Sequence, residues 1–91
     1  MAQLRISESS QLLQIKSEPY VLYGRRGYQP VIDVENIHTG EIGYLVISAQ
    51  SLSEPLFELS VGNNGKLNNI TLIIRKESKD RMSPYIVSKQ D

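Results

Sequence analysis

The chain has 91 residues, a length that suits one small domain, and we expect that domain to span residues 1–91. Ten Lys or Arg balance ten Asp or Glu, and this formal net charge of zero argues against a strong non-specific DNA binder. The absence of cysteine excludes disulfides and cysteine nucleophiles, and no apolar run is long enough to span a bilayer or form a signal peptide. We therefore expect a cytoplasmic protein with no membrane partner.

The first quarter of the chain predicts strands that are interrupted by a break and a turn. Residues 1–10 are mostly polar and indicate a short strand or a loose N-terminal segment. Residues 11–23 are rich in apolar side chains but are interrupted at Pro19, which cannot donate to a ladder. They therefore form one long bent strand or two short strands. Two glycines then bracket Arg25 and Arg26, a pattern that is typical of a turn.

Residues 28–37 and 42–48 predict the clearest hairpin of the chain. Gly40 lies in the turn between them and can adopt the positive φ that such a turn requires. In the first strand Ile32 and Val34 share one face, which we expect to be buried, while the other face is partly wet. The second strand is apolar on both faces.

Residues 49–61 predict a short helix. Its leucines recur at helical spacing along one face: Leu52, Leu56 and Leu59. We expect Ser51 or Ser53 to cap the N-terminus, which places Pro55 in the first turn, where a missing N–H costs little. Gly62 is the expected C-cap.

Residues 69–77 and 84–88 predict the last two strands. The inward face of the first of them carries three aliphatic residues: Ile70, Leu72 and Ile74. Three strands, one helix and two strands indicate a mainly β fold, a five-stranded OB-like Greek-key barrel with one short helix between strands 3 and 4. A different small barrel, such as an SH3-like one, is the alternative, and the helix argues against it.

Residues that could carry catalysis are sparse. His38 is the single histidine and falls in a predicted turn, so no second His or Cys can complete a metal site with it. Asp33 and Glu35 alternate along a strand, which is typical of its solvated face. The serines lack a base at a recognisable spacing. We therefore expect no enzyme, no catalytic residue, no metal and no cofactor.

Cations and tyrosines cluster where an OB barrel binds its ligands. Residues 61–91 hold six Lys or Arg and three Asp or Glu, which predicts a positive region. The loops between strands 1 and 2 and between strands 4 and 5 flank the binding face of OB domains, where cations hold phosphates and aromatic rings stack on bases. Eight residues are therefore candidates for nucleic-acid binding: Arg25, Arg26, Tyr28, Tyr44, Arg75, Lys76, Lys79 and Arg81.

The same residues also have plainer interpretations. Tyr23, Tyr44 and Tyr85 lie among aliphatic residues, a setting that is more typical of partly buried core positions than of stacking platforms. The arginine turn and the basic stretch before Tyr85 could be solvated hairpin tips, since charged tips keep sheet edges from aggregating.

Three stretches share the pattern of a known family: residues 31–48, the helix that follows them, and residues 70–87. In these stretches the chain resembles small OB-fold single-strand-binding proteins, such as those of phages and prokaryotes. The resemblance implies single-stranded DNA or RNA as the partner. Where such proteins commonly place Trp or Phe on the binding strands, this chain offers Tyr.

A protein–protein interaction module is the alternative function. The strand at 42–47 is apolar on both faces, and an exposed apolar strand is a natural surface for dimerisation or for sheet extension. Tyr44 and Val46 would then form the contact. The chain would serve as a homodimer or as an accessory or modulator subunit, for example a phage-encoded modulator of a host enzyme.

Overall fold

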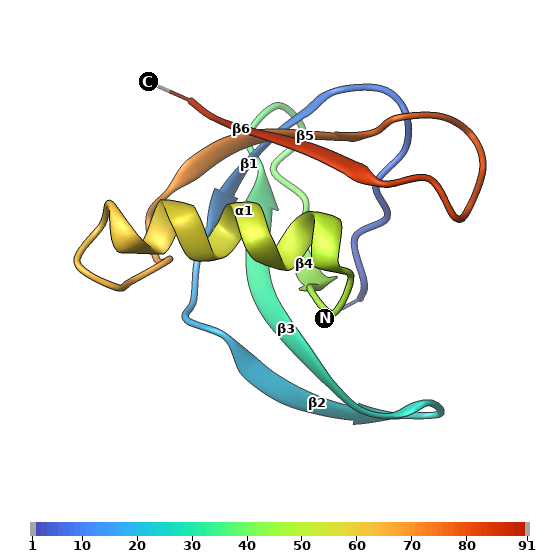
Figure 1. The fold of residues 1–91 in the computed structure, drawn as a ribbon, viewed down its shortest axis with the longest axis horizontal. Coiled ribbons are helices and arrows are strands. Elements are labelled where there is room, and N and C mark those ends of the chain that lie inside the picture. Colours follow the sequence, from blue (N-terminus) through green and yellow to red (C-terminus); the bar gives the residue numbers. More distant parts are fainter. Residues whose placement is uncertain (1, 91) are drawn as a thin grey trace.

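The apolar patterns of the sequence produce a mainly β protein with one helix. The structure is a computed structural model that describes residues 2–90, and in it six antiparallel strands form one sheet, with the helix between the fourth and fifth strands (Figure 1). No helix among the described residues is long and apolar enough to cross a membrane. The elements are β1 (Gln11–Ile15), β2 (Tyr20–Gly24), β3 (Gly27–Asn36), β4 (Ile42–Val46), α1 (Gln50–Val61), β5 (Thr71–Lys76) and β6 (Tyr85–Lys89).

The prediction of five strands was wrong by one, because the chain breaks between β1 and β2. Lys16 still donates its N–H to the carbonyl of Asp33, but the returning N–H of Asp33 goes to the hydroxyl of Ser17 at 2.9 Å. The side chain of Ser17 thus replaces a backbone partner, and Pro19 follows with no N–H to offer. Of the two alternatives for residues 11–23, the structure has two short strands.

Strand β3 organises the sheet. Its first half pairs with β2 and its second half with β1, both along one edge, while β4 pairs along the other edge. The second edge of β1 pairs with β5, and β5 pairs with β6. Strands β4 and β6 do not pair, so the sheet is not closed into the barrel that the sequence predicted.

The N-terminal segment covers the edge of β4 that closure would have used. Leu4 donates its N–H to the carbonyl of Tyr44 at 2.9 Å, and the N–H of Tyr44 donates to the carbonyl of Ala2 at 3.0 Å. Gly43 makes this approach feasible, because a Cβ at this position would lie 2.4 Å from the Ala2 carbonyl oxygen. Further along, the N–H of Lys76 donates to the carbonyl of Ser7. Residues 2–7 therefore connect β4 with the end of β5.

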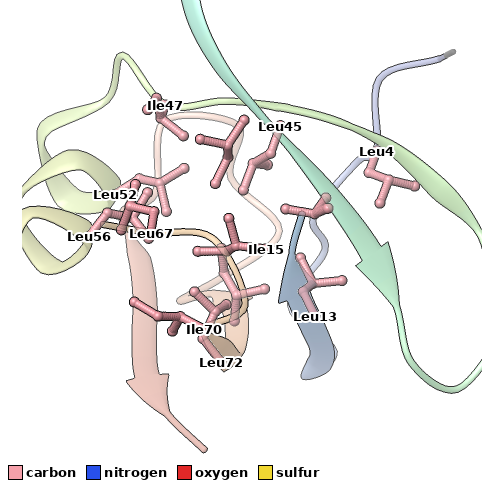
Figure 2. Packing of buried hydrophobic residues seen from close by; sticks show 13 residues of the cluster. Leu4, Leu13, Ile15, Leu45, Ile47, Leu52, Leu56, Leu67, Ile70 and Leu72 are labelled. Atoms are coloured by element: carbon pink, nitrogen blue, oxygen red, sulfur yellow. The ribbon is translucent and has the colours of Figure 1, made fainter. Parts of the chain in front are cut away.

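The core lies between the sheet and α1 (Figure 2). The predicted inward faces of the strands and the helix are confirmed, because their aliphatic residues pack in one cluster with Leu4 and Leu67. Members of that cluster from the predicted faces include Ile32, Val34, Leu52, Leu56, Ile70, Leu72 and Ile74, and Leu45 and Ile47 from the strand that is apolar on both faces join them.

The start of α1 differs from the prediction, whereas its end agrees. Ala49 is the N-cap and makes no side-chain capping bond, so neither Ser51 nor Ser53 caps the helix, and Pro55 lies beyond the first turn. The hydroxyl of Ser51 instead accepts the N–H of Tyr85 at 3.0 Å, which attaches the helix to β6. Gly62 is the C-cap, as predicted.

Candidate nucleic-acid interface

A polar depression of about 400 Å³ lies between the β2–β3 hairpin, the end of β4 and the start of β6. No Asp or Glu among residues 2–90 lines it. Its polar and aromatic lining consists of Gln3, Arg5, Arg26, Gln29, Ser48 and Tyr85. An anion that entered this depression would therefore meet a lining that holds two arginines and, among the described residues, no carboxylate.

The two arginines come from different segments of the chain, the turn between β2 and β3 and the N-terminal segment. Arg26 lies in the turn between β2 and β3, which Gly27 closes with a φ of 87°. Arg5 follows Leu4, whose burial in the core fixes the N-terminal segment. Among residues 2–90 neither guanidinium forms an ion pair, so both positive charges are available to a ligand.

Tyr85 connects this depression with a second one. Tyr85 lines the first depression, and its ring lies under the Lys76 ammonium, with Nζ 5.3 Å from the ring centroid. Lys76 in turn lines the second depression, which is also about 400 Å³, together with Lys79, Arg81 and residues 6–9. Lys76 and Tyr85 are cross-strand partners, so the two depressions meet at this pair.

We call the cations of the two depressions the basic track: Arg5, Arg26, Lys76, Lys79 and Arg81. Within the described part of the chain, Glu8 is the one carboxylate that lines either depression, and it lies 3.7 Å from Lys79 in an exposed ion pair. The ammonium of Lys76 donates to the carbonyl of Arg81 at 3.0 Å, which holds the lysine next to Tyr85. The basic track thus offers a line of positive charge with an aromatic ring in its middle.

Arg25 and Tyr28 lie at the tip of the β2–β3 hairpin, outside the two depressions. Tyr28 is 75% exposed, and its ring centroid lies 4.9 Å from that of Tyr23, which is 72% exposed. The two rings share one face of the hairpin because they are cross-strand partners. They form an exposed aromatic pair on the face of the hairpin opposite to Gln29, which lines the first depression.

Tyr44 and Arg75 are two further predicted site residues that line neither depression. Tyr44 is half-buried on β4, where its partners are Asp33 on β3 and Gln3 of the N-terminal segment. Arg75 is half-buried, and its guanidinium donates to the carbonyl of Lys76 at 3.1 Å. Because neighbours on a strand point to opposite faces, Arg75 and Lys76 lie on different sides of β5.

The apolar strand at 42–47 is less open than a free assembly surface. The N-terminal segment occupies its outer edge, and Tyr44 and Val46 are half-buried. Ile42 is 55% exposed and lies at the end of the strand. A role of this strand in assembly stays a prediction.

Other surface features offer less chemistry than the basic track. An apolar pocket of about 200 Å³ lies between α1 and Pro19, with Phe57 and Leu67 in its wall. His38 is exposed, and the described residues contain no group of three His, Cys, Asp or Glu that could hold a metal. No protein-family model, curated protein or solved structure matches this chain. The candidate site is therefore inferred from the geometry of this structure and from its sequence.

Sequence reasoning missed Arg5, the residue that doubles the charge of the first depression. Residues 1–10 were expected to form a short strand or a loose segment, so Arg5 had no assigned surroundings. A signal was present, because Leu4 and Ile6 alternate with Gln3 and Arg5, as in a strand with one buried face. The buried Leu4 and the half-buried Ile6 follow that alternation.

Proposed function

We propose that this protein binds single-stranded nucleic acid along the basic track and is not an enzyme. The observation that carries this proposal is the first depression, where Arg5, Arg26 and Tyr85 line one space that no carboxylate of residues 2–90 lines. Non-specific binding of single strands needs cations that follow the phosphates and aromatic faces on which bases stack. The basic track supplies the cations, while Tyr85 supplies an aromatic ring within it.

The order of strand pairings supports an OB-like interpretation of the fold. If β1 and β2 together stand for the first strand of an OB barrel, then β3, β4, β5 and β6 stand for strands 2 to 5. The helix then falls between strands 3 and 4, where the OB arrangement has it. The pairing of strand 3 with strand 5 is missing, which makes this an open variant of a barrel that is partly open in other OB domains.

In that arrangement the first depression lies where OB domains bind their ligands. Arg26 belongs to the loop between strands 1 and 2, and Tyr85 follows the loop between strands 4 and 5. A duplex keeps its bases stacked inside, whereas a single strand can turn a base toward Tyr85. We therefore expect single strands to bind more tightly than duplex.

The charge of the protein limits the affinity that we expect. Five cations that each neutralise one phosphate predict a plot of log K against log salt with a slope of about −3.5 for single strands. The net charge of zero adds little long-range attraction. Binding should therefore be moderate and strongly dependent on salt.

The test is fluorescence anisotropy of a labelled oligo(dT) of about 20 nucleotides, titrated with protein at about 20 mM and about 100 mM salt. The variant Arg5→Gln/Arg26→Gln should bind more weakly and reduce the salt slope by about 1.4, since each contact contributes about 0.7. A matched control, Lys66→Gln/Lys89→Gln, removes the same charge from exposed positions off the basic track and should bind almost as well as the wild type.

Two results would contradict the proposal. One is that the labelled single strand shows no binding even at the lower salt concentration. The other is an equal loss of affinity in the track variant and the control variant, which would show that overall charge decides binding. The same titration with an oligo(U) strand and with a duplex would rank RNA, single-stranded DNA and double-stranded DNA.

A further inference from the structure

Strand β2 leaves one edge of the sheet open. It pairs with β3 alone, at the end of the strand order, and the β2–β3 hairpin projects from the rest of the chain (Figure 1). Val21 lies opposite Pro30, which has no N–H, so this is a non-hydrogen-bonded pair of the antiparallel ladder. By the alternation of such ladders, Tyr23 and Tyr28 form another non-hydrogen-bonded pair. The backbone N–H and C=O groups of Val21 and Tyr23 therefore point away from β3, toward the open edge.

This edge lacks the usual protections against pairing. Natural sheets protect open edges with charged side chains, prolines, bulges or a covering segment. The sequence of β2 is Tyr-Val-Leu-Tyr-Gly, which contains no charge and no proline. By contrast, residues 2–4 cover the outer edge of β4, and Ser51 of α1 accepts the first N–H of β6.

We propose that β2 pairs with β2 of a second copy of this chain, in antiparallel orientation about a two-fold axis at Leu22. In this register Val21 of one copy lies opposite Tyr23 of the partner subunit, and the open backbone groups of both residues pair in both directions. Aromatic residues opposite β-branched residues are favourable cross-strand pairs. The two copies of Leu22 meet at the axis as a close, non-hydrogen-bonded pair.

The ends of the strand favour a second copy over an unrelated peptide. The antiparallel register places the Arg25–Arg26 turn of one copy beside residues 17–19 of the other, where Glu18 carries a negative charge. Two-fold symmetry repeats this attraction between the arginine turn and Glu18 of the partner subunit, once at each end of the paired strands. Arg25 lines neither depression, whereas Arg26 of the same turn belongs to the basic track, so the dimer contact and the nucleic-acid contact share this turn.

Cross-linking through an introduced cysteine tests the register directly, because the natural chain contains no cysteine. In the proposed dimer the Cα atoms of the two copies of Leu22 lie about 4.5 Å apart, within the range that a disulfide accepts. We expect the variant Leu22→Cys to form a disulfide-linked dimer under mild oxidation. The control Lys66→Cys, at an exposed position away from β2, should stay mostly monomeric.

A second measurement follows the unmodified edge by sedimentation velocity at protein concentrations up to about 500 µM, since a single-strand interface is small. The variant Val21→Pro removes an N–H that only the partner would use, and it should raise the dimer dissociation constant at least about tenfold. The variant Val21→Thr keeps that N–H and should dimerise as the wild type does. Circular dichroism should show that both variants are folded.

Three results would overturn the proposal. They are a wild-type chain that sediments as a monomer over the whole concentration range, a Val21→Pro dimer as tight as the wild-type dimer, and a Leu22→Cys variant that cross-links no faster than Lys66→Cys. A stable dimer that survives Val21→Pro would assign assembly to another surface, such as the apolar strand at 42–47.

Discussion

Glu18 and Leu67 lie 49 positions apart in the chain and are joined by a hydrogen bond of 2.9 Å, in which the Leu67 N–H donates to the carboxylate. The second carboxylate oxygen accepts the N–H of Asn68 at 2.8 Å. Glu18 thereby attaches the break between β1 and β2 to the loop before β5. The two backbone donors lower the pKa of Glu18, chiefly through Leu67 and then through Asn68, while desolvation opposes them.

The variant Glu18→Gln should therefore lower the melting temperature at neutral pH. A carboxyl group whose pKa is lowered by folding contributes stability above its ordinary value of 4.5, and this contribution disappears as pH falls through the lower folded-state pKa. The difference in melting temperature between wild type and variant should thus be larger at about pH 7 than at about pH 3. The control Glu41→Gln changes an exposed carboxylate that accepts no hydrogen bond among residues 2–90. Equal melting temperatures for Glu18→Gln and wild type at neutral pH would contradict this role.

Gly43 determines whether the N-terminal segment can lie on β4. A methyl group at this position would meet the Ala2 carbonyl oxygen at 2.4 Å and the Leu4 Cγ at 2.9 Å. We expect Gly43→Ala to lower the free energy of unfolding by about 1–3 kcal/mol, as overpacking does, and to displace Arg5 from the first depression. Gly24→Ala is the matched control, because a Cβ there meets no atom within 4 Å. Urea unfolding of both variants gives the comparison, and equal stabilities would show that the segment adapts without cost.

Ser51 attaches α1 to β6 through its hydroxyl, which accepts the Tyr85 N–H at 3.0 Å. Replacing Ser51 by Ala removes a bond worth about 1 kcal/mol, and the better helix propensity of Ala returns about half of that. Ser53→Ala makes the same change two residues further along α1, where the hydroxyl forms no hydrogen bond among the described residues. Thermal unfolding should show a lower melting temperature for Ser51→Ala than for Ser53→Ala. The reverse order would show that the contact between Ser51 and Tyr85 does not stabilise the fold.

Period-two patterns made the strand faces predictable. Ile70, Leu72 and Ile74 are buried as the alternation required, since one face of β5 lies on the core. Val31 shows the limit of this rule. It alternates with Asp33 on the face expected to be partly wet, yet it is fully buried, because it lies between β2 and β4 in the middle of three strands.

Long-range contacts were not predictable from local sequence. The strand break depends on the hydroxyl of Ser17, which accepts the Asp33 N–H in place of a backbone carbonyl. The presence of a serine in the sequence does not indicate which distant N–H it will accept. The sheet stays open because the N-terminal segment lies on the outer edge of β4. This contact pairs Gln3 with Tyr44, which are about forty residues apart in the chain. The outcome of that competition depends on the close approach at Gly43, which a pattern of apolar residues does not encode.

The candidate site divides in the same way. Arg26 was predictable because a turn between two strands places it locally. Arg5 joins it only through the long-range placement of the N-terminal segment. Lys79 was expected to be free for phosphates, but it lies 3.7 Å from Glu8, a neighbour that only the folded chain reveals.

Tyr85 allows charge and stacking to be separated within the basic track. If a base stacks on its ring, Tyr85→Leu should weaken binding of oligo(dT) by at least about fivefold, since base stacking on an aromatic residue contributes about 1–3 kcal/mol. Tyr85→Phe keeps the ring, and with it the face over which Lys76 lies, so its affinity should stay within about twofold of the wild type.

Two controls make the Tyr85 result specific. The salt slope should be the same for Tyr85→Leu and wild type, because no phosphate contact is removed. Circular dichroism should show that Tyr85→Leu is folded, since the ring also packs against the core. A folded Tyr85→Leu that binds as tightly as the wild type would show that the basic track holds its ligand by charge alone. Loss of affinity in both Tyr85→Leu and Tyr85→Phe would assign the contribution to the hydroxyl and not to stacking.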